Sequence, residues 1–460
     1  MAHTSIATTA ERIVYRIAGL PVAISALLAS SALETVDPLQ SAFAWDYWHP
    51  EGAAEWLELI GGLVAWPVCV LGGTLWFTAR NGAIVRSRSG KGIPAQVVHQ
   101  LKLYFSDGVL APWYYIFSLY DDDGSERARG YLQRFETKPT IFPLLKRRRG
   151  SPLSDKVRFA EFCEERGIRC VETILHLEGR APEGPLPDRD LFVKRSNDRG
   201  GRGAERWDRV GWSAFVGPDG QQLTADALLE RLVARSRRTA LIVQPRLRTH
   251  PELVDLTAGA LPTVRIATCL DEKGEPELIG AVFRMSIGGN RTVDNLHAGG
   301  IAAAVDLASG RLSRATNLGA DARLGWLSVH PDTGAQIEGR ELPLWEEAKL
   351  LAATAHRAFT DRVVIGWDVA VTEDGPVIVE GNGNPDMDIL QRFMREGLRE
   401  HRFADLLAFH LRNRVPAISK RLCAGGEAAL HRSDEAGRLY PYQRQADAGR
   451  PRLGSQLSQE

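Results

Sequence analysis

Two long uncharged stretches near the N-terminus restrict what this chain can fold into. Residues 17–33 and residues 59–79 contain no Asp, Glu, Lys or Arg. A helix that crosses a bilayer needs about 20 predominantly apolar residues, so the second stretch is long enough and the first is slightly short. Arginines precede the first stretch and follow the second, whereas the segment between them carries only acidic charges. By the positive-inside rule, we expect a membrane hairpin with both ends in the cytoplasm.

Two other interpretations of these stretches stay open. Both contain Gly and Pro, so they could be buried core helices instead. Alternatively, the first could be a cleaved signal peptide, and the second would then return the chain to the cytosol. Either membrane interpretation predicts a membrane-associated protein that contacts lipid through its N-terminal region and keeps its main body in the cytoplasm.

The overall charge and the cysteines point to no further partner. Lys plus Arg and Asp plus Glu each number 57, for a formal net charge of 0. We therefore expect no nucleic-acid partner. The five cysteines show no C-x-x-C spacing, so neither a zinc site nor a disulfide framework is predicted. Reduced thiols are typical of a cytosolic main body.

The pattern along the chain predicts four regions. Residues 1–95 form the membrane hairpin region, and residues 96–150 form a helical, aromatic-rich connecting subdomain. The aromatic cluster of that subdomain, with the basic run at 146–149, could also be a membrane-surface segment. Residues 151–415 are expected to form the main domain. Residues 416–460 hold few large apolar side chains, which predicts a disordered tail.

From residue 151 the pattern is that of an α+β fold. A helix is predicted over 155–166 and another from Pro343 onward, where apolar residues recur at three- and four-residue steps. Strands are predicted at 191–193, 240–243, 264–270, 278–283, 363–370 and 377–379. Because strands outnumber helices in the middle of this region, we expect antiparallel sheets rather than a doubly wound parallel sheet.

A predicted hairpin near residue 374 carries a set of oxygen ligands. Asp374-Gly375 is a turn signal between two apolar strands. Folding the chain there brings Asp368 close to Glu380, and the two-residue step places Asn382 on the same face as Glu380. Two carboxylates and an amide oxygen form a hard-oxygen site of the kind that Mg²⁺ uses with nucleotide phosphates. The alternative is a solvated hairpin with ordinary surface charges, but both carboxylates sit in apolar runs, where an unpaired charge is costly.

A lysine followed by glycines forms a second candidate element. Lys194 ends the predicted strand at 191–193, and Gly200, Gly201 and Gly203 follow it. Glycines let backbone N–H groups approach phosphate oxygens, and a lysine supplies a point charge for them. The spacing is not that of a P-loop, and alone it is a weak signal, because glycine-rich turns between strands are common.

Together these motifs resemble the ATP-grasp superfamily. The chain is most similar to the sugar-transfer-associated ATP-grasp family, which is related to α-L-glutamate ligases. The resemblance covers roughly residues 100–415 and rests on Asp368 with Glu380-x-Asn382, on the lysine strand and on several shorter phrases. These are Lys156, Gln244-Pro245, His250-Pro251-Glu252, Thr263-Val-Arg265, Phe283-Arg284 and the segment Asp294-Asn295-Leu-His297. The resemblance implies an ATP-grasp fold, in which two α+β subdomains clamp ATP between antiparallel sheets.

The resemblance also implies roles for individual residues. Lys156 and Lys194 would hold the α- and β-phosphates of ATP, under a lid formed by Gly200, Gly201 and Gly203. Gln244, Pro245, Arg246 and Leu247 would be the hinge that reads adenine, and Glu252 would hold the ribose. Asp368, Glu380 and Asn382 would ligate Mg²⁺. The remaining four, Arg265, Arg284, Asn295 and His297, would line the cavity around the γ-phosphate. Many relatives carry Glu where this chain has Gln244, but an amide also bonds the amino group of adenine.

These roles define an expected activity. The chain would be an ATP- and Mg²⁺-dependent ligase that joins a carboxylate to an amine or another nucleophile through an acyl-phosphate and releases ADP and phosphate. The family name suggests a place in surface polysaccharide or cell-envelope metabolism. Two alternatives are a small-molecule kinase on the same fold and a non-catalytic nucleotide-binding scaffold at the membrane. Arg265, Arg284 and His297 could each have a structural role instead, as a surface charge, a rim ion pair and a core histidine.

Overall fold

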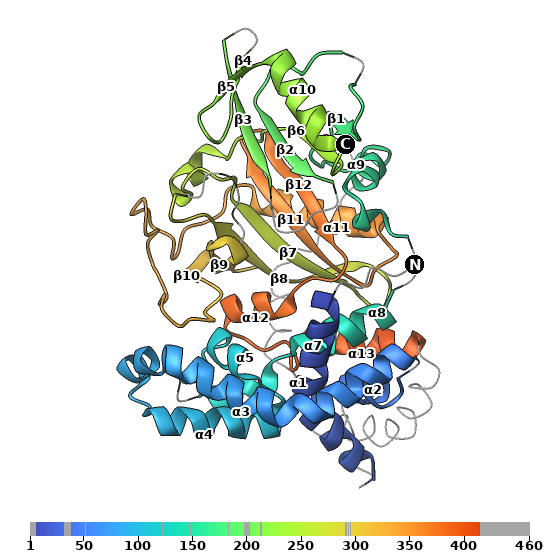
Figure 1. Ribbon diagram of the computed structural model, residues 1–460, viewed down its shortest axis with the longest axis vertical. Helices are drawn as coiled ribbons and strands as arrows, with labels where there is room; N and C mark the ends of the chain where they lie inside the picture. The colour runs from blue at the N-terminus through green and yellow to red at the C-terminus, as the bar shows by residue number, and fades with distance from the viewer. Residues whose placement is uncertain are drawn as a thin grey trace, which may run out of the picture.

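Two antiparallel sheets stand above a layer of helices in the computed structural model of the chain (Figure 1). The structure describes residues 6–31, 38–50, 52–121, 123–146, 150–182, 184–196, 203–211, 214–289, 292, 294 and 296–414. The predicted tail therefore lies outside the described residues, as do residues 147–149 of the basic run.

The first sheet has six strands in the order β1-β6-β2-β3-β4-β5. Its core joins Leu191 and Val193 of the sheet to Trp207 and to Leu228 and Leu232 of helix α10. Helix α10 begins after Thr224, whose hydroxyl accepts a hydrogen bond from the Ala227 N–H at 3.2 Å. The elements of this part are α9 (Lys156–Glu164), β1 (Leu175–Leu177), β2 (Leu191–Arg195), β3 (Glu205–Val210), β4 (Ala214–Val216), β5 (Gln222–Thr224), α10 (Ala225–Ser236) and β6 (Leu241–Pro245).

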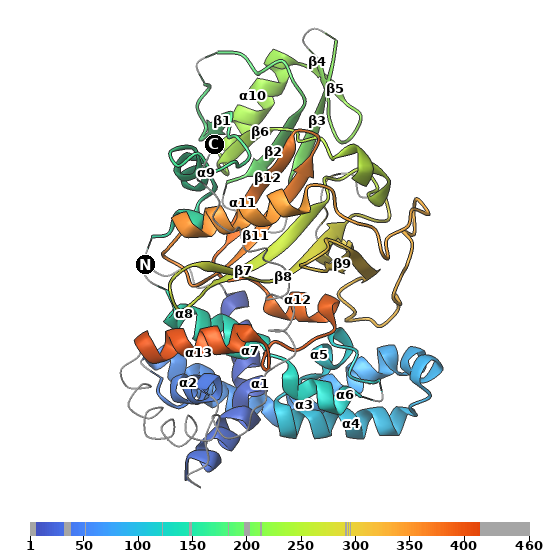
Figure 2. The same cartoon turned by 180° about the vertical axis from the view of Figure 1, so that it is seen from behind.

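The second sheet also has six strands, in the order β10-β9-β8-β7-β11-β12. Every residue of its strand β11 is buried, because helices cover both faces of the sheet. Helix α11 (Trp345–Ala358) packs on one face, and α12 (Met387–Met394) and α13 (Arg402–Arg414) pack on the other (Figure 2). The strands are β7 (Thr263–Leu270), β8 (Pro276–Met285), β9 (Ile301–Val305), β10 (Leu312–Thr316), β11 (Val364–Thr372) and β12 (Gly375–Asn382).

The helical base, α1 to α8, is not separate from this sheet. Leu39 and Leu132 of the base share one hydrophobic core with Val282 of the sheet and Leu407 of α13. The helices of the base are α1 (Ile6–Ser31), α2 (Pro38–Trp48), α3 (Ala53–Ser89), α4 (Ile93–Asp107), α5 (Ala111–Ile116), α6 (Gly124–Gly130), α7 (Arg134–Glu136) and α8 (Phe142–Leu144). Four short helical turns link these parts: η1 (Thr137–Ile141), η2 (Pro152–Ser154), η3 (Pro251–Leu256) and η4 (Leu296–Ala298).

The predicted α+β class and antiparallel sheets are confirmed, and residues 96–146 are mainly helical and packed. Their aromatic side chains are largely buried against one another: Tyr104, Tyr114, Tyr115, Phe117 and Tyr120. Each of the six predicted strands overlaps an observed strand, and the predicted helix at 155–166 is α9. The helix predicted to open at Pro343 begins instead at Trp345, because Leu344 adopts a left-handed conformation with φ 55°.

The second uncharged stretch lies in α3, which is long and apolar enough to cross a membrane, with a mean hydropathy of 1.7 over its most apolar window. Only 22% of that window is buried, so the core-helix interpretation is wrong for α3. The first stretch lies in α1, apart from residues 32–33, which are outside the described residues. Ile17, Ala18 and Ala23 of α1 are buried within the base.

Candidate active site

The predicted acidic hairpin is present. Strands β11 and β12 pair in a register that sets Asp368 opposite Glu380 and Gly366 opposite Asn382. Asn382 Nδ2 donates a hydrogen bond to Glu380 Oε1 at 3.3 Å, so these two side chains do share a face. The turn itself is Glu373-Asp374, one residue earlier than predicted, and Gly375 opens β12 with φ 111°.

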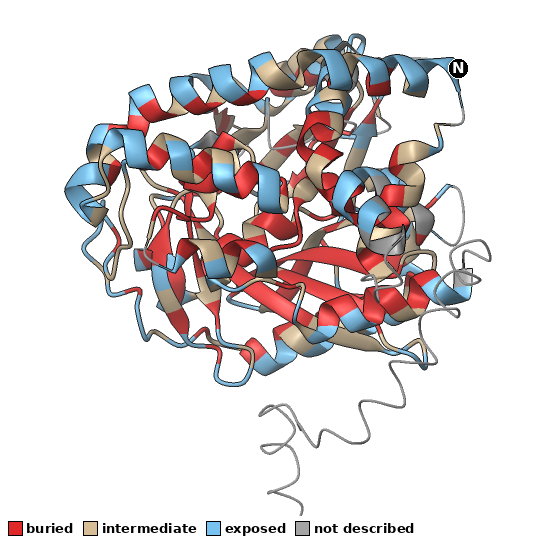
Figure 3. Cartoon of the chain, turned by 90° about the horizontal axis from the view of Figure 1, so that it is seen from below, coloured by how far each residue is buried: buried red, intermediate tan, exposed pale blue. Residues whose placement is uncertain are grey.

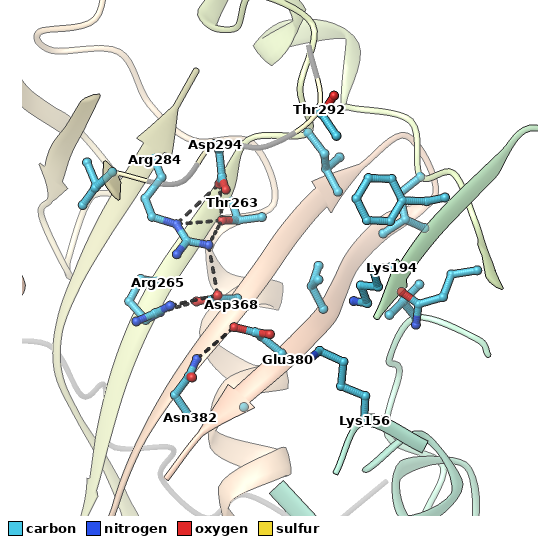
Figure 4. A pocket seen from close by; sticks show the side chains of 18 of the residues that line it. Lys156, Lys194, Thr263, Arg265, Arg284, Thr292, Asp294, Asp368, Glu380 and Asn382 are labelled. Carbon is cyan, nitrogen blue, oxygen red and sulfur yellow. Dashed lines mark hydrogen bonds and ion pairs between the residues drawn. The ribbon is translucent and has the colours of Figure 1, made fainter. Parts of the chain in front are cut away.

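Two arginines hold Asp368. Arg265 of β7 lies opposite Asp368 across the sheet and donates from both Nε and Nη2, the latter at 2.9 Å. Arg284 Nη2 of β8 lies 3.0 Å from Oδ2 of the same carboxylate, the oxygen that Arg265 Nη2 also contacts (Figure 4). Burial by itself would raise the pKa of Asp368, but the two guanidinium groups outweigh burial and hold the pKa well below its ordinary value. Asp368 is therefore ionised and already neutralised by protein cations.

Thr263 and Asp294 orient Arg284; both residues lie in motifs singled out in the sequence, but the sequence predicted no role for either. Arg284 Nε donates to Thr263 Oγ1 at 3.0 Å and lies 3.4 Å from Asp294 Oδ2. Thr263 Oγ1 in turn donates to Asp294 Oδ2 at 2.5 Å. Burial raises the pKa of Asp294, and Arg284 and Thr263 oppose that rise. A signal existed for Thr263, because strand alternation places it on the same face as Arg265.

The two predicted lysines face this acidic group. Lys194 comes from β2 and Lys156 from the first turn of α9, and both ammonium groups point toward Glu380 (Figure 4). Lys156 Nζ also donates to the backbone carbonyl of Ser196 at 3.2 Å. Burial lowers the pKa of Lys194 to about 8; Glu380 opposes this shift and Lys156 adds to it. The two lysines line one cleft of about 1910 Å³ between the two sheets, together with Asp368, Glu380 and Asn382.

The predicted hinge residues lie in the same cleft. Gln244, Pro245, Arg246 and Leu247 line it, at the end of strand β6 and just beyond. The Arg246 side chain is held by ion pairs with Asp190 and Asp208, and its backbone N–H donates to the Asp190 carbonyl at 3.0 Å.

Not every predicted residue falls on the cleft wall. His297 lines the cleft, on the short helical turn η4. Glu252 does not: it lies exposed on η3, where its backbone carbonyl accepts a hydrogen bond from Arg340. The ribose role predicted for Glu252 is therefore not supported by its position. Gly203 lies beside Arg195 rather than on the cleft wall. Gly200, Gly201 and Asn295 lie outside the described residues.

The helical base supplies part of the cleft wall, which the sequence did not predict. Glu11, Arg134 and Lys138 line the cleft beside Asp386, which follows β12. Arg134 Nη1 lies 2.5 Å from Asp386 Oδ1, and Lys138 forms an ion pair with the same carboxylate. These contacts join the base to the segment that directly follows the strand carrying Glu380 and Asn382.

The ligand set fits a hard divalent cation that also touches phosphate. Among the described residues, no group of three or more His, Cys, Asp or Glu side chains converges as a closed metal site. Glu380 and the amide oxygen of Asn382 remain available beside the neutralised Asp368, as in Mg²⁺ sites that take one or two carboxylates plus substrate phosphates. Such a site needs the nucleotide to complete it.

Comparisons with solved structures give distant similarities. D-alanyl-alanine synthetase A from Vibrio cholerae is 13% identical, with a TM-score of 0.33 over 57% of this chain and 65% of that one. D-alanine–D-alanine ligase from Bacillus anthracis complexed with ATP is 11% identical, with a TM-score of 0.32 over 58% and 68%. N5-carboxyaminoimidazole synthetase from Staphylococcus aureus is 9% identical, with a TM-score of 0.29 over 51% and 45%. This chain thus spans less than two thirds of the first and third of these structures.

A comparison with curated proteins found no match. The protein-family model described as sugar-transfer associated ATP-grasp matches residues 142–404, which is more than half of the chain and contains both sheets and most of the residues that line the cleft. The chain belongs to the sugar-transfer associated ATP-grasp family.

Proposed function

We propose that this protein is an ATP- and Mg²⁺-dependent ligase that joins a carboxylate to an amine or another nucleophile through an acyl-phosphate. The observation that carries the proposal is the cleft itself: Lys156 and Lys194 face Glu380, Asn382 and the arginine-held Asp368 across one space. Cations on one wall and hard oxygen ligands on the other match the needs of a nucleotide triphosphate with its metal.

Each wall has its own task in this proposal. Lys156 and Lys194 bind the α- and β-phosphates, and Gln244 to Leu247 bind adenine through backbone groups. Glu380, Asn382 and Asp368 would hold Mg²⁺, which supplies positive charge to the β- and γ-phosphates. The glycine-rich loop with Gly200, Gly201 and Gly203 closes over the phosphates and excludes water. Asn295 and His297 line the cavity around the γ-phosphate.

Arg265 and Arg284 stabilise the reacting phosphoryl group. A substrate carboxylate oxygen attacks the γ-phosphorus, the bond to the bridging oxygen breaks, and ADP leaves. The nucleophile then attacks the acyl carbon and inorganic phosphate departs. Because the two guanidinium groups are fixed by Asp368, Thr263 and Asp294, they need no reorganisation as charge develops on the phosphoryl oxygens.

We also propose that the protein acts at a membrane, with its catalytic domain on the cytoplasmic side, in cell-envelope or surface polysaccharide metabolism. The support is α3, an apolar helix whose most apolar window is largely exposed.

The purified chain, incubated with ATP, Mg²⁺ and panels of carboxylates and amines, tests the activity. The expected products are ADP and phosphate, formed only when a carboxylate and a nucleophile are both present. Formation of AMP would overturn the acyl-phosphate route. A phosphorylated product that accumulates without any nucleophile requirement would identify a kinase instead.

A further inference from the structure

The outward side of α3 is uncharged over most of its length. Leu57, Val64 and Val68 expose 71%, 73% and 76% of their surface, and Ile60, Leu63, Leu71, Leu75 and the rings of Trp56 and Trp76 are exposed beside them. Residues 56–79 contain one charged residue, Glu58, and its side chain is buried. Monomeric soluble proteins rarely expose an apolar surface this continuous.

The polarity of α3 is inverted relative to a helix that faces water. Within residues 56–79 the carboxylate and the hydroxyl groups are on the buried side: Glu58 lies 3.5 Å from Arg12, and Thr78 accepts a hydrogen bond from Gln100 at 2.8 Å. A helix of a soluble domain turns its apolar stripe inward and its polar side outward. The reversed arrangement indicates that the medium outside α3 is apolar.

Contacts hold α3 against the rest of the protein along most of its length. Near its start, Gly62 packs against the side chain of Arg16 in α1. Near its end, Asn81 Nδ2 donates to the Ala320 carbonyl at 3.2 Å, and Arg88 donates to the Ala322 and Arg323 carbonyls, both at 2.6 Å. These contacts extend over roughly 40 Å of helix, at 1.5 Å per residue.

Both ends of α3 therefore lie next to the same body. Its first turns pack on α1, whose Tyr15 hydroxyl accepts a hydrogen bond from Arg134 at the cleft, and its last turns contact the loop after β10 (Figure 1). A helix that crossed the bilayer would separate its ends by about 30 Å of hydrocarbon. It would also draw Arg16, His99 and Lys102 of its neighbours α1 and α4 into the membrane, which is costly.

The flanks of the uncharged side fit an anionic lipid surface. Arg80 and Arg86, near the C-terminal end of α3, are exposed, and so is Lys102 of the adjoining α4. The Arg80 guanidinium lies 4.7 Å from the centroid of the exposed Trp76 ring, a pairing suited to the boundary between headgroups and acyl chains. Figure 3, which views the molecule from the base, shows exposed turns along its helices. Val98 and Phe105 add exposed apolar surface on α4.

We propose that α3, flanked by α4, lies in the plane of an anionic membrane surface, with its uncharged side in the headgroup and acyl boundary, and does not cross the bilayer. This proposal deepens the membrane association proposed above and replaces the predicted hairpin. It does not depend on ligase activity.

Vesicle flotation of the full chain tests the surface. We expect binding to vesicles of phosphatidylcholine mixed with phosphatidylglycerol, and weaker binding to phosphatidylcholine alone. Replacing Leu57, Val64, Val68 and Leu75 with Ser should weaken binding roughly 100-fold or more, because four exposed apolar side chains are lost. The matched control replaces Val210, Val329 and Leu350, exposed apolar residues away from the base, with Ser and should bind like the wild type. Absence of flotation, or flotation unaffected by the α3 substitutions, would overturn the proposal; a stable dimer that buries this surface instead would do the same.

Labelling distinguishes an in-plane helix from a spanning one. A cysteine is introduced at either Gly52 or Ser87, both exposed at the ends of α3, in a chain in which Cys69, Cys170 and Cys423 are Ser and the buried Cys163 and Cys269 are kept. In cytoplasmic-side-out membrane vesicles, an impermeant maleimide should label both positions without detergent. If one position reacts only after detergent is added, α3 crosses the bilayer and the proposal is wrong. Nucleotide affinity, measured in the same samples without lipid, shows separately whether the ATP site is intact.

Discussion

At the scale of single residues, the cleft separates two kinds of carboxylate. Asp368 is 3% exposed and held by two half-buried arginines, whereas Glu380 is half-buried and is contacted by an amide and faced by two lysines. We therefore expect the Asp368 carboxylate to stabilise the fold and the Glu380 carboxylate to be free to bind a ligand. Substitutions that remove the charge of one carboxylate should distinguish its effect on stability from its effect on activity.

Asp368→Asn should destabilise the fold as well as abolish activity. Removal of one partner from a buried ion pair typically costs about 3–5 kcal/mol, since the arginines left behind are uncompensated. Glu380→Gln is the matched control: we expect it to leave the free energy of unfolding within about 1 kcal/mol of the wild type and to abolish Mg²⁺-dependent turnover. Urea unfolding monitored by circular dichroism measures the first quantity and ADP release the second. Equal losses of stability in the two variants would show that Asp368 does not stabilise the fold more than Glu380 does.

Lys194 should make ATP binding depend on pH. Its pKa of about 8 in the free protein lies below the ordinary 10.5, because burial disfavours the ammonium form. Phosphates favour that form, so ATP binding takes up a proton above pH 8, and the affinity should fall as pH rises, by at most ~10-fold per unit. Lys194→Met should bind more weakly and lose this dependence.

Isothermal titration between pH 7 and 9.5, in two buffers with different ionisation enthalpies, measures the affinity and the proton uptake together. An unchanged slope in Lys194→Met would assign the titrating group to another residue.

At the scale of elements, the site depends on how closely β12 packs against its neighbours. Gly381 lies between Glu380 and Asn382, and a Cβ added there would lie 2.8 Å from Cζ3 of the fully buried Trp367 and 2.5 Å from Cδ2 of Leu153. Only glycine lets β12 approach the ring this closely. The spacing of the two ligands on β12 is therefore coupled to packing on the opposite face of the strand.

Gly381→Ala should lower both stability and activity. We expect a loss of about 1–3 kcal/mol in the free energy of unfolding, as for other overpacked cores, and a higher Mg²⁺ concentration for half-maximal turnover. Gly325→Ala is the control, because a Cβ there meets nothing closer than Arg88 Nη2 at 3.9 Å. Wild-type stability and Mg²⁺ dependence in Gly381→Ala would show that β12 shifts freely.

At the scale of the whole molecule, the helical base and the second sheet form one folding unit. Leu39 and Ala42 of α2 lie in the same core as Leu407 and Leu411 of α13, and Tyr104 Oη donates to the Ile17 carbonyl of α1 at 3.0 Å. Arg134 and Lys138 of the base also line the cleft. The catalytic part and the apolar surface of α3 are therefore parts of one rigid arrangement.

A chain that begins at residue 96 should not fold by itself. It would lack α1 to α3 and expose Tyr104, Phe135 and the α13 residues Leu407 and Leu411, which they cover. We expect aggregation even with detergent, and no cooperative thermal transition. A soluble truncated chain with wild-type ATP affinity would show that the base only attaches the protein to the membrane.

Much of the catalytic part followed from the sequence alone. Two apolar runs with a turn signal between them predicted the hairpin that brings Asp368 close to Glu380, and the two-residue step from Glu380 predicted that Asn382 shares its face. Lys194 was placed for the same reason, at the end of a short apolar strand. The long uncharged stretch likewise identified α3 as an apolar helix by length and composition.

Tertiary packing decided the rest. Side-chain periodicity does not say which strands are neighbours. The sheet order places β7 beside β11 and β8 beside β7, and this order brings Arg265 and Arg284 to Asp368 and Asp294 to Arg284. Glu252 lies outside the cleft because it is exposed on η3. Hydropathy counts apolar residues without direction, so it could not distinguish a helix that spans a bilayer from one that lies along it. The proposal that α3 lies along the bilayer rests on the contacts of Gly62, Asn81 and Arg88, which hold both ends of α3 against one body.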